Sequence, residues 1–167
     1  MDALGDRRHS PGAQDARPRL EYDKVAPGAI QALRGLDSYV RTSGLEPALV
    51  ELVRVRSSQI NGCAYFIDVS TKEARAGGES EHRLYALPAW REAPFFTPRE
   101  RAALAWAEAL TSISDTHVPD GVYEDARRHF TEKELVDLAV AVAAINAWNR
   151  MALSFRAVPG TYQPKKH

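Results

Sequence analysis

The most reactive side chain in this sequence belongs to Cys63, the only cysteine. An intrachain disulfide is therefore excluded, and any chemistry at sulfur must use a single thiol. Cys63 directly follows Asn61-Gly62, a turn signal, and lies where a new helix is expected to begin. Free amides and the positive end of the dipole at a helix start lower the pKa of a thiol. The position therefore predicts a nucleophile at Cys63.

Four other side chains are expected close to this sulfur. Glu51 precedes Cys63 on the preceding helix, and a tight turn would fold that helix back so that the carboxylate serves as a base. Phe66 and Ser70 follow Cys63 at helical spacing and project from roughly the same face. Tyr65 is a candidate hydrogen-bond donor lining the same pocket. Candidates for added positive potential are Arg54, Arg56 and Lys72.

Helical periodicity runs through most of the chain and defines the elements that must position these residues. Prolines at 27, 47 and 98 suit first turns, and Thr97 with Glu100 and Thr131 with Glu134 form capping boxes. We expect helices over 27–44, 47–60, 63–77, 80–87, 97–109, 119–130 and 131–155. No segment alternates as a strand does, so the predicted fold class is all-α, with antiparallel helix hairpins joined by short loops. Residues 1–20 are predicted to be a flexible N-terminal tail and residues 21–167 one domain.

The composition narrows the function classes. Lys plus Arg and Asp plus Glu both number 22, so no basic field favours a nucleic acid partner. The longest apolar run, 138–145, is too short to span a membrane, and the first residues lack the apolar stretch of a signal peptide, so we expect a cytoplasmic protein. His82, His117 and His129 lack metal-ligand spacing, and neither a metal nor a cofactor is expected.

The segment from Gln59 to Arg75 resembles the active-site signature of the alkylhydroperoxidase D-like (carboxymuconolactone decarboxylase) superfamily. In that signature a glutamate precedes a Cys-x-x-Cys-x-x-x-His run by about twelve residues. The glutamate corresponds to Glu51 and the first cysteine to Cys63, whereas Phe66 stands at the second cysteine and Ser70 at the histidine. The similarity continues at 90–96, 100–106, 146–150 and 155–160, so it covers about residues 20–162.

The resemblance implies an oligomeric helical bundle, a homotrimer or homohexamer, that reduces hydroperoxides and is recycled by an external thiol or lipoyl-type reductant. The missing second thiol makes the intramolecular disulfide cycle impossible here, and serine does not titrate near neutrality. Three interpretations follow. The protein is an alkylhydroperoxidase-like antioxidant protein with a one-cysteine centre of weak or lost activity, a non-catalytic oligomer that binds a ligand or partner, or a carboxymuconolactone decarboxylase-type lyase acting on another small-molecule substrate.

Overall fold

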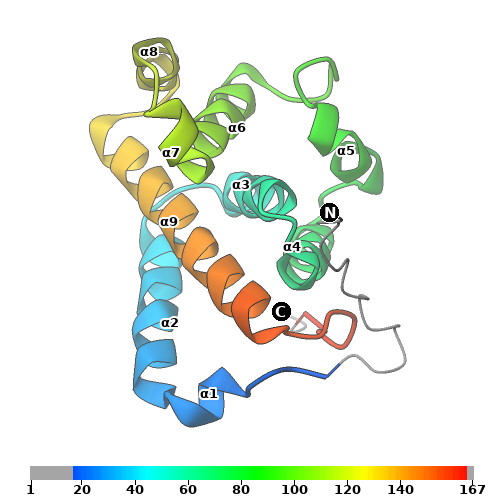
Figure 1. The fold of residues 1–167 in the computed structure, drawn as a ribbon. Helices are drawn as coiled ribbons and strands as arrows, with labels where there is room; N and C mark the ends of the chain where they lie inside the picture. Colours follow the sequence, from blue (N-terminus) through cyan, green and yellow to red (C-terminus); the bar gives the residue numbers. More distant parts are fainter. Residues whose placement is uncertain (1–16, 165–167) are drawn as a thin grey trace, which may run out of the picture.

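The helices begin where the sequence supplies residues suited to a first turn. The structure, a computed structural model, describes residues 17–164, and all regular structure within that range is helical (Figure 1). In chain order the elements are α1 (Tyr22–Val25), α2 (Pro27–Thr42), α3 (Pro47–Ile60), α4 (Ala64–Ala76), α5 (Glu81–Ala86), η2 (Leu87–Ala89), α6 (Pro98–Thr111), α7 (Ile113–Thr116), α8 (Asp120–His129) and α9 (Glu132–Phe155). The predicted all-α fold class is confirmed.

The predicted starts and ends of the longer helices are also confirmed. Prolines occupy the first turn of α2, α3 and α6, and both predicted capping boxes are formed, at Thr97 with Glu100 and at Thr131 with Glu134. Gly44 and Gly78 follow α2 and α4 with positive φ, as the ends of helices favour. The short elements α1, α7 and η2 were not predicted, because three or four residues show no periodicity.

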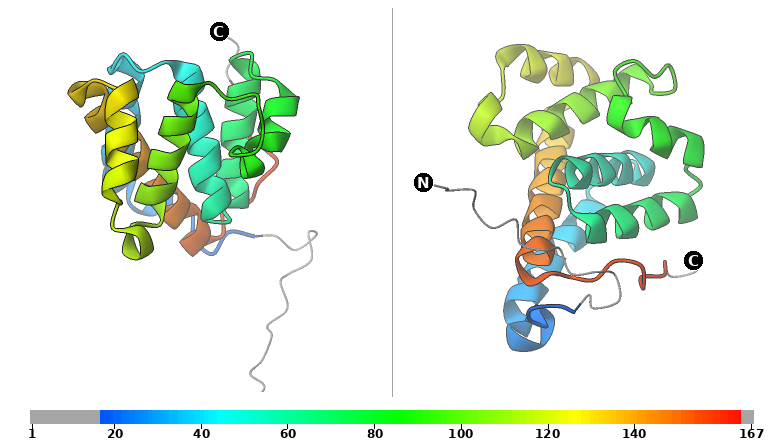
Figure 2. Two further views of the ribbon diagram at one scale, coloured as in Figure 1. Left: turned by 90° about the horizontal axis from the view of Figure 1, so that it is seen from above. Right: turned by 45° about the vertical axis from the view of Figure 1, so that its right-hand side comes forward.

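Helix α3 lies at the centre of the bundle. It packs against α4, α6 and α9, while α2 packs along α9, so α3 is covered on several sides (Figures 1 and 2). Leu52, Val53 and Val55 on α3 are at most 1% exposed. This central helix carries Glu51, which is therefore held on a rigid element.

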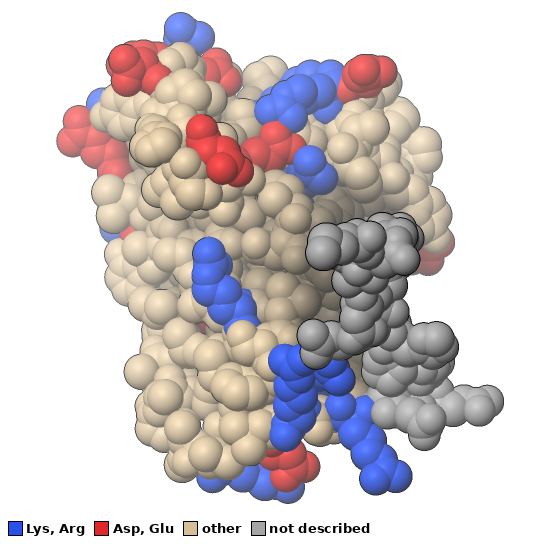
Figure 3. Space-filling model, viewed as in Figure 1, with Lys and Arg blue, Asp and Glu red and all other residues tan. Residues whose placement is uncertain are grey.

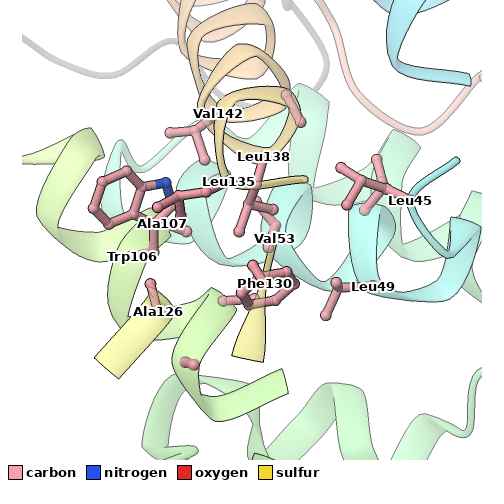
Figure 4. Close-up of a cluster of buried hydrophobic side chains, with 14 of the residues drawn as sticks. Leu45, Leu49, Val53, Trp106, Ala107, Ala126, Phe130, Leu135, Leu138 and Val142 are labelled. Carbon is pink, nitrogen blue, oxygen red and sulfur yellow. The ribbon is translucent and has the colours of Figure 1, made fainter. Parts of the chain in front are cut away.

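The largest apolar cluster joins α3, α6, α8 and α9 at one end of the bundle. Val53, Phe130 and Leu138 meet there, together with Trp106, which lies over α8 and α9 (Figure 4). A second cluster packs α5 and η2 onto α3 and α6 around Trp90, and a third surrounds Cys63 and Trp148. All three tryptophans are thus core residues.

Helix α9 spans the whole bundle. It is the one helix within residues 17–164 that is long and apolar enough to cross a membrane, but half of that stretch is buried by other helices, as in the core helix of a soluble domain. Most of the predicted N-terminal tail lies outside the described residues. In its described part, the backbone N–H of Arg19 donates to the carbonyl of Phe155 over 2.8 Å, and its side chain donates to the carbonyl of Ser154.

Candidate active site

The turn between α3 and α4 sets the position of the candidate residues. Gly62 has φ +65°, and the backbone N–H of Cys63 donates to the carbonyl of Ser58 over 2.9 Å. The chain therefore reverses tightly after Asn61, and α4 packs back along α3. This is the hairpin that the sequence predicted, and it brings Glu51 on α3 beside residues of α4.

A cleft of about 400 Å³ lies between α2 and α4, with α3 as its floor. Four predicted site residues line it: Glu51, Tyr65, Phe66 and Ser70. Its other lining residues are Tyr22, Asp23, Ile30, Arg34, Asp37, Arg41, Arg54, Val69, Glu73, Trp148 and Tyr162. The volume is in the usual range for small-molecule sites.

Cys63 is not among the residues that line this cleft. Its side chain is 1% exposed and belongs to an apolar cluster with Ile30, Phe66, Ile145, Trp148 and Ala152. Three members of that cluster, Ile30, Phe66 and Trp148, also line the cleft. The sulfur therefore lies behind the apolar wall of the cleft and not on its surface.

The expected acidity of the Cys63 thiol is wrong in direction. Burial raises the pKa of this thiol above its ordinary value, and the backbone amides of Phe66 and Tyr65 at the start of α4 lower it by less. The helix start does favour the thiolate, as predicted, but removal of water from the sulfur outweighs that effect.

The three basic side chains expected near Cys63 are engaged with carboxylates. Arg54 pairs with Asp37 at 2.6 Å, Arg56 with Glu108 at 2.8 Å and Lys72 with Asp68 at 2.9 Å. Each positive charge is therefore largely neutralised by its carboxylate partner and adds little positive potential at the sulfur.

Glu51 has the properties of a proton-transfer group. Burial raises the pKa of its carboxyl, against the lowering effect of Arg54, whose Nη1 donates to Oε1 over 3.3 Å. The other oxygen, Oε2, is buried and has no hydrogen-bond partner among the described residues. A carboxyl group that lies in a cleft, with a raised pKa and a vacant oxygen, is suited to accept or return a proton.

Asp37 organises the wall of the cleft opposite α4, and the sequence analysis did not identify it. Its Oδ1 accepts from Arg54 and its Oδ2 accepts from the indole Nε1–H of Trp148 over 2.8 Å. The available signal was a lone acid between Leu33 and Val40 on the apolar side of α2. Asp37 holds Arg54 beside Glu51 and ties α2 to α9.

The C-terminal segment after α9 forms another side of the cleft. The hydroxyl of Tyr162 donates to Glu73 of α4, and burial together with this hydrogen bond raises the pKa of Tyr162 to about 12. Lys72 donates to the carbonyl of Tyr162 over 3.0 Å, and the N–H of Gly160 donates to Asp68. Tyr162 is therefore a neutral donor at pH 7, and sequence spacing gave no sign of it.

Two buried asparagines of α9 form hydrogen bonds to the α3–α4 hairpin. Asn146 accepts from Asn61 over 2.8 Å, and Asn149 accepts from Ser58 over 3.1 Å. These bonds fix the α3–α4 turn against α9. Within residues 17–164, no three His, Cys, Asp or Glu side chains gather in a way that would hold a metal ion.

The fold and this cleft define an all-α protein of the alkylhydroperoxidase type, and comparison with known proteins agrees. Residues 27–109 match the profile of the carboxymuconolactone decarboxylase family. YdfG of Bacillus subtilis (strain 168), an uncharacterized protein, is 39% identical over 136 residues, which are 81% of this chain and 92% of that protein. The chain belongs to the carboxymuconolactone decarboxylase family.

Solved structures show the same fold. ATU0492 of Agrobacterium tumefaciens, a protein of unknown function described in connection with antioxidant defence and AhpD, is 42% identical with a TM-score of 0.85, over 87% of this chain and all of that one. A peroxidase-related protein of Ralstonia eutropha JMP134, described as an alkylhydroperoxidase AhpD core, has a TM-score of 0.74 at 23% identity, over 86% of this chain and 77% of that one. The second likeness concerns the fold alone.

Proposed function

We propose that this chain is an alkylhydroperoxidase-like protein of the antioxidant type that binds a small organic substrate beside Glu51 and has weak thiol peroxidase activity. One observation carries the proposal. Phe66 and Ser70, which stand at the second cysteine and the histidine of the family signature, line the cleft with Glu51, whereas Cys63 lies behind its wall. These two positions in the lining of the cleft therefore carry neither a thiol nor an imidazole, and the remaining thiol is covered.

The residual reaction at Cys63 is a one-thiol cycle. The sulfur attacks the outer oxygen of a hydroperoxide, the O–O bond breaks, and a proton from the thiol passes to the departing alcohol, which leaves a sulfenic acid. An external thiol then attacks the sulfenic acid, which gives a mixed disulfide and water. A second external thiol attacks this mixed disulfide, which frees the Cys63 thiol and leaves a disulfide between the two external thiols. Glu51 is the group in the cleft suited to carry the proton to the alcohol. A reducing compartment such as the cytoplasm suits this cycle.

Restoring the signature tests the proposal. In the double variant F66C/S70H, a second thiol and an imidazole enter the cleft beside Glu51, and with a dithiol reductant we expect hydroperoxide consumption about 100-fold or more above the wild-type rate. Stopped-flow or coupled assays of hydroperoxide loss measure this. A wild-type rate equal to that of the double variant would contradict the proposal.

Two controls accompany the double variant. Ser70→His alone supplies no second thiol and is expected to remain near the wild-type rate. Cys63→Ser in the F66C/S70H background removes one member of the restored pair and is expected to abolish turnover of the disulfide cycle. Undiminished turnover in that triple variant would show that Cys63 plays no part.

A second candidate, a decarboxylase-type lyase, is favoured by one observation. The raised pKa and vacant Oε2 of Glu51 suit transfer of a proton to or from carbon without a thiol. Release of carbon dioxide from lactone acids by the wild type, unchanged in Cys63→Ser and lost in Glu51→Gln, would support this candidate over the peroxidase.

We also propose that the chain forms a homo-oligomer, which the family resemblance implies as a trimer or hexamer. Support comes from α9, where Val136, Val140, Ala143 and Ala147 follow one another at helical spacing, with Val136 62% exposed. The surface over α9 and α2 carries few charged side chains on the face shown in Figure 3. Sedimentation equilibrium, with Val136→Glu and Ala143→Glu as disrupting variants, measures the subunit number.

A further inference from the structure

A second cavity continues the cleft toward the other end of α2 and α4. It has a volume of about 460 Å³ and lies between the end of α2, the first half of α3 and the end of α4. Aliphatic and small side chains make up most of its lining beyond the shared residues, among them Val40, Leu45, Ala48, Val50 and Ala74. This space is suited to a flexible hydrocarbon chain, because burial of apolar surface needs no specific partner.

Charged residues mark the junction of the two cavities. Asp37, Arg41, Glu51, Arg54 and Glu73 line both. Arg54 is engaged by Asp37 at 2.6 Å and by Glu51 at 3.3 Å, and Glu73 accepts from Tyr162. Arg41 is different, since it makes no hydrogen bond or ion pair with any residue of the described range 17–164.

Arg41 is therefore a cation that a ligand can engage without breaking an existing pair. Its charge reaches the junction, where it lowers the pKa values of both Glu51 and Tyr162. A guanidinium matches a carboxylate in two parallel hydrogen bonds. Glu51, whose Oε2 has no hydrogen-bond partner among residues 17–164, lines the same junction of the two cavities.

We propose that the second cavity and its junction with the cleft bind an aliphatic monocarboxylate, with the carboxylate on Arg41 and the hydrocarbon chain in the second cavity, among Val40, Leu45 and Val50. This inference deepens the proposed function, on which it rests, because it names an aliphatic carboxylate as the part of a hydroperoxide substrate that the protein recognises. A carboxylate on Arg41 places the adjoining atoms of the ligand beside Glu51, where protons are exchanged. The net charge of the residues that line the junction does not attract an anion. Recognition therefore depends on the guanidinium of Arg41 and on burial of the ligand's hydrocarbon chain.

Calorimetric titration of the full-length protein with decanoate, 1-decanol and acetate tests the proposal. We expect decanoate to bind, acetate to bind too weakly to measure, and affinity among shorter carboxylates to rise about fourfold per added methylene until the cavity is filled. Arg41→Gln should weaken decanoate binding about tenfold or more and leave decanol unchanged. Ala48→Trp, which fills the apolar cavity from an exposed first-turn position, should weaken both decanoate and decanol.

The matched control is Arg34→Gln, on the same helix two turns from Arg41 and outside the second cavity. It should bind decanoate as the wild type does. Equal loss of decanoate affinity in Arg34→Gln and Arg41→Gln, or full affinity in Ala48→Trp with a native circular dichroism spectrum, would overturn the proposal. Failure here is distinguishable from failure of the proposed function, because the hydroperoxidase gain of F66C/S70H is read with a simple alkyl hydroperoxide that needs neither Arg41 nor the second cavity.

Discussion

Two glutamates on neighbouring central helices, Glu51 on α3 and Glu108 on α6, show how the same residue type is given opposite properties. Both lie beside arginines, and their side chains are similarly covered, at 19% and 16% exposed. Yet the pKa of Glu51 is raised and that of Glu108 is lowered. Surface exposure therefore does not distinguish them, although the Glu51 carboxyl lies deeper among protein atoms than that of Glu108.

The number of hydrogen-bond donors is a second difference between them. Burial acts to raise the pKa of Glu108, but hydrogen bonds from the Trp90 indole, Arg91 and Arg56 together reverse that effect. Glu51 receives one long hydrogen bond, from Arg54, and its second oxygen has no partner among residues 17–164. A saturated carboxylate serves as a structural tie, and an unsaturated one is available to a substrate.

The largest effect that would sharpen this comparison concerns stability. We expect Glu108→Gln to lower the free energy of unfolding by about 2–3 kcal/mol, because Arg56 would be left half-buried without its anionic partner. Glu51→Gln, the matched variant, should change it by less than about 1 kcal/mol, since the amide resembles the protonated acid that burial already favours. Urea unfolding at pH 7 measures both, and equal losses would remove the distinction.

The second effect is a pair of opposite pH dependences. The folded-state pKa of Glu51 lies above its ordinary 4.5, so the stability that its protonated form contributes is lost as pH rises from about 4.5 through that raised pKa. The folded-state pKa of Glu108 lies below 4.5, so its contribution is present above 4.5 and is lost as pH falls through the lowered pKa.

Unfolding free energies of the wild type and the two glutamine variants from about pH 2.5 to pH 8 test this pair. The difference between wild type and Glu51→Gln should decline with rising pH, and the difference for Glu108→Gln should decline with falling pH. Parallel profiles would mean that both carboxyls experience the same environment.

The helix starts and the hairpin that form the cleft were predictable from the sequence. The prolines and capping boxes define helix starts through contacts within one turn, and Asn61-Gly62 predicts the α3–α4 hairpin that brings Glu51, Phe66 and Ser70 into one cleft. Such features depend on residues close together in the chain, where spacing is informative.

The ion pairs and hydrogen bonds that set the charge of the site were not predictable, because they join residues distant in sequence. Arg56 was expected to influence Cys63, yet it binds Glu108 from another helix. Asp37 meets Trp148 across 111 positions. The coverage of the sulfur by Ile145 and Ala152 likewise depends on how α9 crosses the hairpin. Spacing alone carries no information on these contacts.

The smallest effect in this series concerns Cys63, which extends the comparison to a group that is buried without charged partners. Burial raises the pKa of its thiol above 9.0, against the backbone amides of Phe66 and Tyr65. We expect labelling by a neutral thiol reagent at pH 8 to be about tenfold slower in the folded protein than in urea, with a pH midpoint above that of a free thiol. Tyr65→Phe serves as a control that retains both amides, and it should label at the wild-type rate. A folded protein that labels faster than the unfolded chain, with a midpoint below 9.0, would contradict the raised pKa of this thiol and support the acidic nucleophile that the sequence predicted at Cys63.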